Sequence, residues 1–309
     1  MVNVRPIIFF GTDDFSAPSL QVLIDEGYDI AAVITKPDSK SGRGQKLAAP
    51  LVKQIAVAND ITVWQPTRLI EISDDIAALG EITGVLVSYG KIIPQSIIDL
   101  FTPGIINIHP SFLPKYRGSS PIEAAILNGD EKIGISVMQL TAAMDAGPVY
   151  GFAEVPLSGT ENQTQLYASI ASKGAQVLKT FLPEILNNSC ALLPQDESLA
   201  TYTQKITKQD GVIDWNKSAI QIEREIRAYA TWPQSRTTLG DVEVIITDAT
   251  AAPAGDISVT PGSVELLKEL GILIVFTGDG SLAINKIKPI GKKEMPVQAF
   301  LAGYASRLV

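Results

Sequence analysis

Residues 4–26, VRPIIFFGTDDFSAPSLQVLIDE, hold the pattern from which the architecture follows. The segment opens with an apolar, β-favouring run from Val4 to Phe10, which ends at Gly11. Apolar residues then recur at helical spacing, which predicts a helix from Ala17 to Glu26. A strand, a turn and a helix in succession are typical of one unit of a parallel α/β sheet.

The same alternation continues along the first half of the chain. Further strands are expected over 30–35, 61–64, 84–88 and 105–109, with a helix over 51–58. Near-continuous apolar strands separated by helices favour a sheet covered on both faces. We therefore predict an α/β fold with a Rossmann-like, doubly wound, mostly parallel sheet. Ligands of such sheets bind beyond the carboxyl ends of the strands, so residues after Phe10, Ser88 and Ile108 are the first candidates.

The second half predicts a smaller domain. A helix over 163–186 closes the first domain, which we place at 1–188, and a polar segment at 189–208 is expected to be a linker. An amphipathic helix over 218–229 stops before Trp232-Pro233. Short alternating runs at 242–246, 271–276 and 281–287 then predict a small OB-like β-barrel or sheet within 209–309.

Composition narrows the class of protein. The 309 residues are 46% apolar and 19% charged, which excludes disordered and fibrous classes. A single cysteine, Cys190, cannot form an internal disulfide, and one Cys with one His cannot build a Cys/His metal cluster. Residues 1–10 lack the pattern of a secretory signal, so we expect none, and no stretch of the sequence approaches about 18 consecutive apolar residues. We expect a cytoplasmic protein without a metal and without membrane contact.

Charge is unevenly distributed along the chain. The net charge of −8, from 25 basic and 33 acidic residues, argues by itself against a polyanionic partner. Between positions 36 and 53, however, five basic residues accompany a single acidic one: Lys36, Lys40, Arg43, Lys46 and Lys53 against Asp38. This segment is a basic loop on an acidic body.

The turn after the first strand, residues 11–15, lacks the Gly-x-Gly-x-x-Gly spacing of dinucleotide-binding sites. Dinucleotide binding is therefore not indicated. The turn is interpreted either as a helix cap or as a ligand-facing turn.

The only histidine, His109, lies in Asn107-Ile108-His109-Pro110 at the expected end of a strand. Strand alternation places Asn107 and His109 on one face, and Pro110 keeps His109 extended. A lone histidine is often structural, but its position at a carboxyl end favours function. A carboxamide and an imidazole side by side can both donate to an oxygen that becomes anionic during attack on a carbonyl.

Asp145, in Met144-Asp145-Ala146-Gly147, supplies the carboxylate that such chemistry needs as a base, although an ordinary Asx-turn is the alternative. No Ser or Cys lies in a nucleophile-elbow context, so a covalent acyl-enzyme is not indicated. The three groups fit direct acyl transfer between two bound substrates.

These residues carry a resemblance to a known family. Residues 107–118, NIHPSFLPKYRG, resemble the signature of the folate-dependent formyltransferases, and Asp145-Ala146-Gly147 resembles their catalytic Asp motif. The similarity runs from 7–12 through 37–50 and 89–94 to 291–295, and so covers essentially the whole chain.

The resemblance implies a donor, an acceptor and a set of roles. The donor would be 10-formyltetrahydrofolate and the acceptor the α-amine of methionine esterified to initiator tRNA. Asn107 and His109 would stabilise the oxyanion, while Asp145 would remove the ammonium proton and orient His109. The folate pocket would be lined by two segments, which contribute Tyr89, Gly90 and Ile92, and Ser111, Phe112, Leu113 and Pro114.

In the family, a loop such as 36–50 reaches the acceptor stem of the tRNA, which implies contacts from Lys40, Arg43 and Lys46. A solvated surface loop is the alternative. The resemblance also implies a C-terminal tRNA-binding domain, and we expect a monomer with no obligate protein partner. Two other functions stay open: formyl transfer to a nucleotide-linked amino sugar, and a non-catalytic folate or nucleotide sensor.

Overall fold

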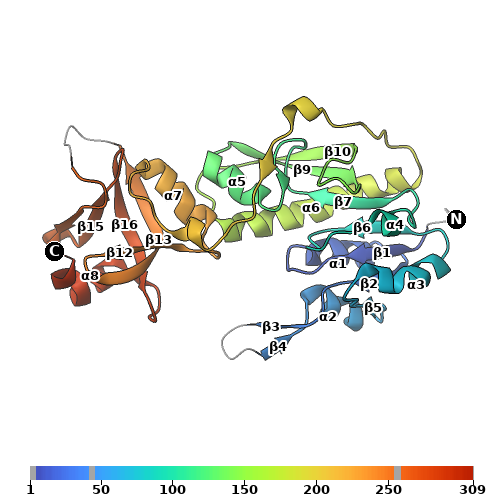
Figure 1. Cartoon of the computed structure of the whole chain (residues 1–309), viewed down its shortest axis with the longest axis horizontal. Helices are drawn as coiled ribbons and strands as arrows, with labels where there is room; N and C mark the ends of the chain where they lie inside the picture. The colour runs from blue at the N-terminus through green and yellow to red at the C-terminus, as the bar shows by residue number, and fades with distance from the viewer. Residues whose placement is uncertain (1–4, 42–45, 254–258, 309) are drawn as a thin grey trace. The chain divides into compact units, whose positions relative to one another are not determined.

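The computed structural model describes residues 5–41, 46–253 and 259–308, and the chain divides into two compact units (Figure 1). Unit 1 consists of Met1–Pro121, Ile133–Val155 and Tyr167–Thr203. Unit 2 consists of Ile122–Lys132, Pro156–Leu166 and Gln204–Val309. The division into 1–188, 189–208 and 209–309 remains a prediction, and the structure adds that two short segments before residue 167 belong to unit 2.

Unit 1 is built on a seven-stranded sheet with the order β10-β9-β7-β6-β1-β2-β5. The strands are β1 (Ile7–Phe10), β2 (Ile30–Ile34), β5 (Val63–Trp64), β6 (Thr83–Leu86), β7 (Ile105–His109), β9 (Lys132–Gln139) and β10 (Val149–Pro156). Neighbouring strands from β5 to β7 pair in parallel, and β9 runs antiparallel to β7. The predicted Rossmann-like, mostly parallel sheet is confirmed.

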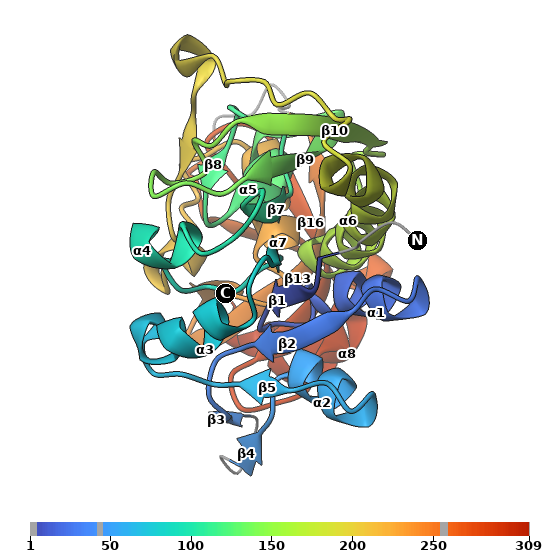
Figure 2. The same cartoon turned by 90° about the vertical axis from the view of Figure 1, so that its right-hand side faces the viewer.

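Helices cover both faces of this sheet. They are α1 (Ala17–Asp25), α2 (Leu51–Ala58), α3 (Ser73–Ala78), α4 (Gln95–Ile98) and α6 (Gln163–Leu186). Figure 2 shows α1, α2 and α6 on one face and α3 and α4 on the other. Every residue of β1 is buried because both of its faces are covered, which explains its unbroken apolar sequence IIFF.

The strand order defines a topological switch point between β1 and β6. The chain runs outward from β1 through β2 to β5 and then returns to β6 on the other side of β1. The connections after β1 and β6 therefore leave the carboxyl edge in opposite directions, and the space between them is where open α/β sheets bind ligands.

Unit 2 contains a six-stranded antiparallel sheet with the order β12-β13-β16-β15-β14, in which β17 pairs with β16. Its elements are α5 (Pro121–Asn128), α7 (Ala219–Ala228), β12 (Ser235–Leu239), β13 (Val242–Ala252), β14 (Val264–Leu267), β15 (Ile272–Phe276), β16 (Ser281–Pro289), β17 (Met295–Pro296) and α8 (Val297–Tyr304). Buried residues of α7, α8 and the sheet, among them Ile222, Phe300 and Val244, share one apolar core. The expected second, smaller β-rich domain is thus present.

Strand β13 is longer than the predicted 242–246 because its register shifts on both sides of Asp248. Such bulges interrupt the alternation of apolar and polar residues that marks a strand in the sequence. Beyond the bulge, the side chains of Asp248 and Thr250 accept hydrogen bonds from Asn285 Nδ2 at 3.4 and 3.0 Å.

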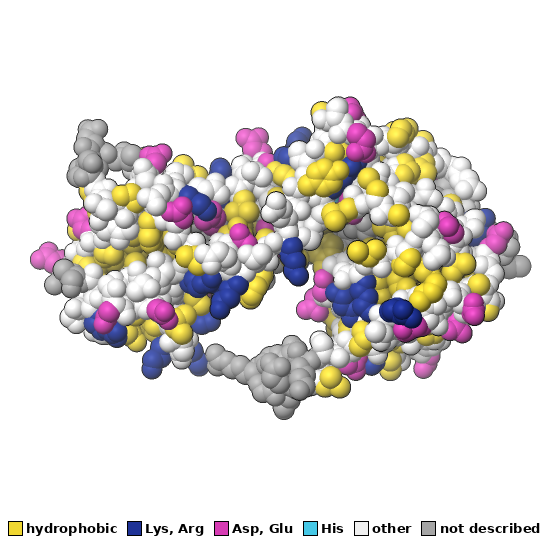
Figure 3. Space-filling model, viewed as in Figure 1, with side chains coloured by type: hydrophobic (Ala, Val, Ile, Leu, Met, Phe, Trp, Pro, Cys, Tyr) yellow, Lys and Arg dark blue, Asp and Glu magenta, His cyan; other side chains and the backbone are white. Residues whose placement is uncertain are grey.

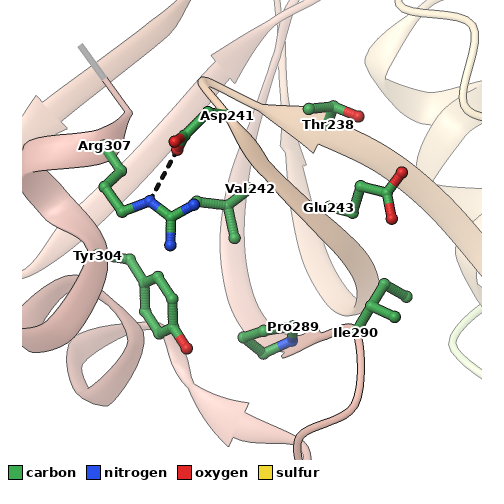
Figure 4. Close-up of a pocket in the computed structure, with 8 residues that line it drawn as sticks. All are labelled: Thr238, Asp241, Val242, Glu243, Pro289, Ile290, Tyr304 and Arg307. Atoms are coloured by element: carbon green, nitrogen blue, oxygen red, sulfur yellow. Dashed lines mark hydrogen bonds and ion pairs between the residues drawn. The ribbon is translucent and has the colours of Figure 1, made fainter.

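Unit 2 has an open cavity of about 570 Å³ (Figure 4). Arg307 donates across it to Asp241 at 2.8 Å and lies 5.8 Å from the ring centroid of Tyr304. Glu243 also lines this cavity, so its charge is mixed. None of the residues predicted to carry chemistry lies in it.

Candidate active site

The connections that follow β1 and β6 are joined by hydrogen bonds at the switch point. The Thr12 hydroxyl donates to the Tyr89 carbonyl at 3.0 Å, and the Ser88 hydroxyl donates to Asp13 Oδ2 at 2.6 Å. Burial raises the pKa of the Asp13 carboxyl, an effect that the Ser88 bond only partly offsets. The turn after β1 therefore holds the loop predicted to bind folate, and its Asp14 carbonyl also accepts the Ala17 amide at the start of α1.

Strand β7 carries the two polar candidates at its carboxyl end. Asn107 pairs with Leu86 of β6 and with Met138 of β9, and His109 pairs with Ser136 of β9. Both side chains are nearly buried, with residue exposures of 6% and 5%. Within the described part of the chain, the Asn107 carboxamide makes no side-chain hydrogen bond, so its donors and acceptor are available to a ligand.

The His109 ring is held by a main-chain carbonyl. Its Nε2 atom lies 3.0 Å from the oxygen of Tyr116, a residue in the left-handed region at φ +60°. A carbonyl oxygen can only accept, so Nε2 carries a proton and donates it to Tyr116. Nδ1 is the nitrogen left to face the rest of the site.

Asp145 approaches that nitrogen from a tight turn. Its Oδ2 atom lies 3.8 Å from His109 Nδ1 and accepts the Gly118 amide proton at 2.8 Å. The first distance allows an ion pair but exceeds a direct hydrogen bond. The Tyr116 carbonyl therefore sets the orientation of the imidazole, and the Asp145 carboxylate balances its charge when Nδ1 is protonated.

Asp145 has a left-handed backbone with φ +46°, which is costly for a residue other than glycine. The same turn is closely packed, because a side chain at Gly147 would overlap the Gln139 carbonyl. Left-handed residues of this kind cluster at functional sites, where surrounding contacts hold them.

A buried cation to which the sequence assigned no role lies next to these groups. Arg117, in the short strand β8 (Arg117–Gly118), is fully buried and donates to Gln195, Glu197 and Tyr202. Its three partners come from the segment that was expected to be a linker. Polar contacts between distant segments leave no periodic pattern in the sequence. The only signal for them was the polar composition of residues 189–208.

The predicted folate loop has contrasting side chains. Tyr89 is 1% exposed and burial raises its pKa to about 12, whereas Ile92 is 90% exposed. Gly90 adopts φ +69°, and a side chain there would overlap the Lys36 ammonium group. The loop thus presents its main chain and Ile92, while Tyr89 anchors it in the core.

The second predicted folate segment is held by its own hydrogen bonds. The Ser111 hydroxyl donates to the Lys115 carbonyl at 2.5 Å, and Ser136 Oγ accepts from the Leu113 amide at 3.1 Å. Phe112 packs edge-to-face on Phe152 with ring centroids 5.6 Å apart, and the peptide bond before Pro114 is cis. The Ser111 carbonyl accepts from Ser136 Oγ at 2.7 Å, so the hydroxyl and several main-chain groups of this segment are engaged and fix its shape.

The basic segment contains the hairpin of β3 (Ser39–Ser41) and β4 (Lys46–Ala48), in which Lys40 pairs with Leu47. Arg43 lies outside the described residues. Lys53 at the end of the segment forms an ion pair with Asp38 at 2.9 Å, so this cation is used within the fold.

Neither a metal cluster nor a membrane span is present among the described residues. They contain no group of three or more His, Cys, Asp or Glu side chains that could hold a metal ion. None of the helices within 5–41, 46–253 and 259–308 is long and apolar enough to cross a membrane.

Comparison with known proteins finds matches to two family models and to near full-length relatives. Residues 5–182 match the family model described as formyl transferase, and residues 205–305 match the formyl transferase C-terminal domain. The chain is 36% identical to methionyl-tRNA formyltransferase of Geobacter sulfurreducens, over 98% of this chain and 95% of that protein. It is 38% identical to the enzyme of the same name from Alkaliphilus oremlandii, over 97% and 96%.

Solved structures share the fold at lower identity. WlaRD, a sugar 3N-formyl transferase, superposes with a TM-score of 0.67 at 22% identity, over 94% of this chain and 100% of that one. The N-formyltransferase of Helicobacter canadensis superposes with a TM-score of 0.68 at 20% identity, over 91% and 99%. With both family models and near full-length relatives in agreement, the chain belongs to the formyl transferase family.

Proposed function

We propose that this protein transfers the formyl group of 10-formyltetrahydrofolate to the α-amine of methionine esterified to initiator tRNA. The observation that carries the proposal is the approach of His109 and Asp145 beside the available carboxamide of Asn107. Relatives at 36% and 38% identity over nearly the whole chain, both named methionyl-tRNA formyltransferase, support this acceptor.

The residues at the carboxyl edge fit a formyl donor. The Asn107 carboxamide is nearly buried yet has donors to spare, which suits a carbonyl-type oxygen and not an apolar group. Ile92 offers an apolar surface for the folate, and the segment 111–114 is held in a fixed shape by its own hydrogen bonds. When bound, 10-formyltetrahydrofolate supplies the formyl carbon that the amine attacks.

Asn107 and His109 stabilise the negative charge that develops on the formyl oxygen. The Asn107 amide donates directly. Because Nε2 of His109 already donates to Tyr116, any proton that the ring offers to the formyl oxygen is carried on Nδ1, the nitrogen that faces Asp145. Preorganised donors of this kind contribute about 100- to 1000-fold each.

Asp145 accepts the proton that the amine must lose. Its Oδ2 atom is held by Gly118, and the remaining lone pairs of the carboxylate can receive a proton from the ammonium group, directly or through water. In the reaction, a bond forms between the amine nitrogen and the formyl carbon, and the bond from that carbon to N10 of the folate breaks. The ammonium nitrogen gives up two protons in all: Asp145 takes one, which is released to solvent, and the other passes to the departing N10.

For the tRNA, we propose contacts from Lys40, Arg43 and Lys46 of the basic segment and from a C-terminal tRNA-binding domain at 209–309. Several Lys and Arg side chains lie on the face of unit 2 seen in Figure 3, although residues 206–309 carry 11 basic and 12 acidic residues. Clustered cations on a nearly neutral domain suit local phosphate contacts. We also propose a cytoplasmic monomer that needs no protein partner.

The test incubates the purified full chain with 10-formyltetrahydrofolate and methionine-charged initiator tRNA, then identifies the amino acid released from the tRNA by mass spectrometry. Formylmethionine is the expected product. Its absence, in a preparation that is folded by circular dichroism, would overturn the proposal. Parallel reactions with a nucleotide-linked amino sugar distinguish the second acceptor, and folate binding without transfer to either acceptor would favour a sensor.

A further inference from the structure

Arg117 of unit 1 is a buried side chain at the centre of a polar network whose partners Glu197 and Tyr202 are exposed. Nε and Nη2 donate to Gln195 Oε1 at 3.0 and 2.8 Å, Nη1 and Nη2 donate to the Glu197 carboxylate at 2.9 and 2.7 Å, and Nη1 donates to the Tyr202 hydroxyl at 3.0 Å. These bonds use all five N–H groups of the guanidinium. The bond from the Arg117 guanidinium holds the pKa of the Glu197 carboxyl below its ordinary value. Because every N–H group is bonded, the guanidinium plane is held in one orientation.

Gln195 connects this network to the turn that carries Asp145. Its Nε2 atom donates to the Asp145 carbonyl at 2.8 Å and to the Gly147 carbonyl at 2.6 Å. The Gln195 amide nitrogen thus binds both the left-handed Asp145 and the last residue of the turn, Gly147. The Gln195 amide oxygen is held by Arg117. Both amide protons are used, so the amide orientation is determined.

The three residues 116–118 form one reference frame for the two candidate groups. The Tyr116 carbonyl holds His109, the Gly118 amide holds the Asp145 carboxylate at 2.8 Å, and the Arg117 side chain holds Gln195. Strand β11 (Tyr202–Thr203) pairs with β8 and closes the frame from the other side. His109 and Asp145 are therefore positioned by the same short piece of chain.

This geometry gives Gln195 a function beyond folding. A left-handed aspartate has a strained main chain, which relaxes unless its neighbours hold it. The two bonds from Gln195 supply that restraint on the main chain, as Gly118 does on the carboxylate. Displacement of a reacting group by about 1 Å can lower a rate by about 100-fold.

We infer that Gln195 is a positioning residue for formyl transfer, which holds the Asp145 turn against the buried Arg117. The inference rests on the proposed function. It assigns a role in the reaction to a segment after helix α6 that would otherwise serve only as a connection.

The test is Gln195→Glu in the full-length protein. Glutamate retains the oxygen that accepts from Arg117 but replaces the amide donor with an oxygen that faces two carbonyl oxygens. We expect kcat to fall by about 10- to 100-fold, while KM for folate and for tRNA changes by no more than about threefold. The matched control is Asn59→Asp, which removes an amide donor to the Ile55 carbonyl (2.9 Å) at the end of α2 and adds the same charge. It should retain wild-type kcat.

A double-mutant cycle separates positioning from a general structural role. If Gln195 acts through Asp145, Gln195→Glu should lower kcat by no more than about twofold when Asp145→Asn is already present. A signal independent of activity comes from the single histidine: the imidazole C–H resonance of His109 should move in Gln195→Glu and not in Asn59→Asp.

Either of two results overturns the inference: wild-type kcat in Gln195→Glu, or full multiplication of its effect with that of Asp145→Asn. Thermal unfolding of each variant checks that the fold is retained, and Gln195→Ala provides a second substitution if the glutamate variant does not fold. A wild-type protein that forms no formylmethionine contradicts the proposed function instead, so the two failures are distinct.

Discussion

Nδ1 of His109 lies 3.8 Å from Oδ2 of Asp145, while Nε2 of the same ring donates to the Tyr116 carbonyl. The two ring nitrogens thus face different partners: Nε2 faces a main-chain carbonyl, and Nδ1 faces the Asp145 carboxylate. The role proposed for His109 in formyl transfer therefore belongs to Nδ1, the nitrogen that faces Asp145.

The Asp145 carboxylate is expected to be required for transfer. Asp145→Asn retains an oxygen that can accept from Gly118 but removes the charge and the proton acceptor. We expect kcat to fall by at least about 100-fold with little change in the unfolding midpoint. Steady-state formylation assays and thermal unfolding of the same preparation measure both. A variant with near-normal turnover would refute the role given to this carboxylate.

Buried Arg117 should matter more to stability than an arginine on the surface. Arg117→Met leaves Gln195 and Tyr202 without their donor, so we expect a loss of roughly 2–4 kcal/mol in the free energy of unfolding. Arg5→Met, which breaks a surface pair with Glu81 at 3.0 Å, should stay within about 1 kcal/mol of wild type. Urea denaturation compares the two. Equal effects would mean that the Arg117 network does not stabilise the fold.

Asp13 should make stability depend on pH. Burial raises its pKa above the ordinary 3.8, so its contribution to stability is complete below 3.8 and is lost as the pH rises through the raised value. Asp13→Asn keeps an oxygen for the Ser88 hydroxyl without the charge. The variant should therefore be more stable than wild type near about pH 7, with a difference that shrinks on acidification. Urea titrations across this range decide the matter, and a difference independent of pH would count against it.

The basic segment should act on tRNA alone. Replacing Arg43 and Lys46 by Ala should raise KM for tRNA and leave KM for the folate unchanged. The salt slope of tRNA binding should fall by about one for each phosphate that is no longer neutralised. Lys179→Ala is the matched control, because this lysine pairs with Glu26 on the body of unit 1. Equal salt slopes for the double variant and wild type would place the tRNA-binding surface elsewhere.

Periodicity was sufficient for the framework of the fold. Residues 51–58, 105–109 and 163–186 form helix, strand and helix with the predicted bounds, because each has a continuous apolar face. Strand β13 extends beyond its prediction because a bulge at Asp248 breaks the alternation. The strand period of two residues and the helix period of about 3.6 residues report which side chains are buried. They no longer predict burial where a bulge interrupts regular strand pairing.

For the site, motifs located the chemical groups but not the interactions that hold them. Asn107 and His109 could be placed together from strand alternation, and Asp145 from the family resemblance. The roles of Tyr116, Arg117 and Gln195 could not, because they depend on hydrogen bonds between segments far apart in the chain, such as the 78 residues that separate Arg117 from Gln195. Long-range polar interactions follow from tertiary packing and have no local signal.

The most direct test of the central claim is the rate of formylmethionyl-tRNA formation by His109→Ala beside wild type. Alanine removes the whole ring, whereas asparagine would keep an N–H donor near the place of Nδ1. We predict product from wild type and a kcat lower by at least about 100-fold in the variant, with the circular dichroism spectrum of a folded protein. A folded His109→Ala protein with a kcat within about threefold of wild type would contradict the proposed role of His109.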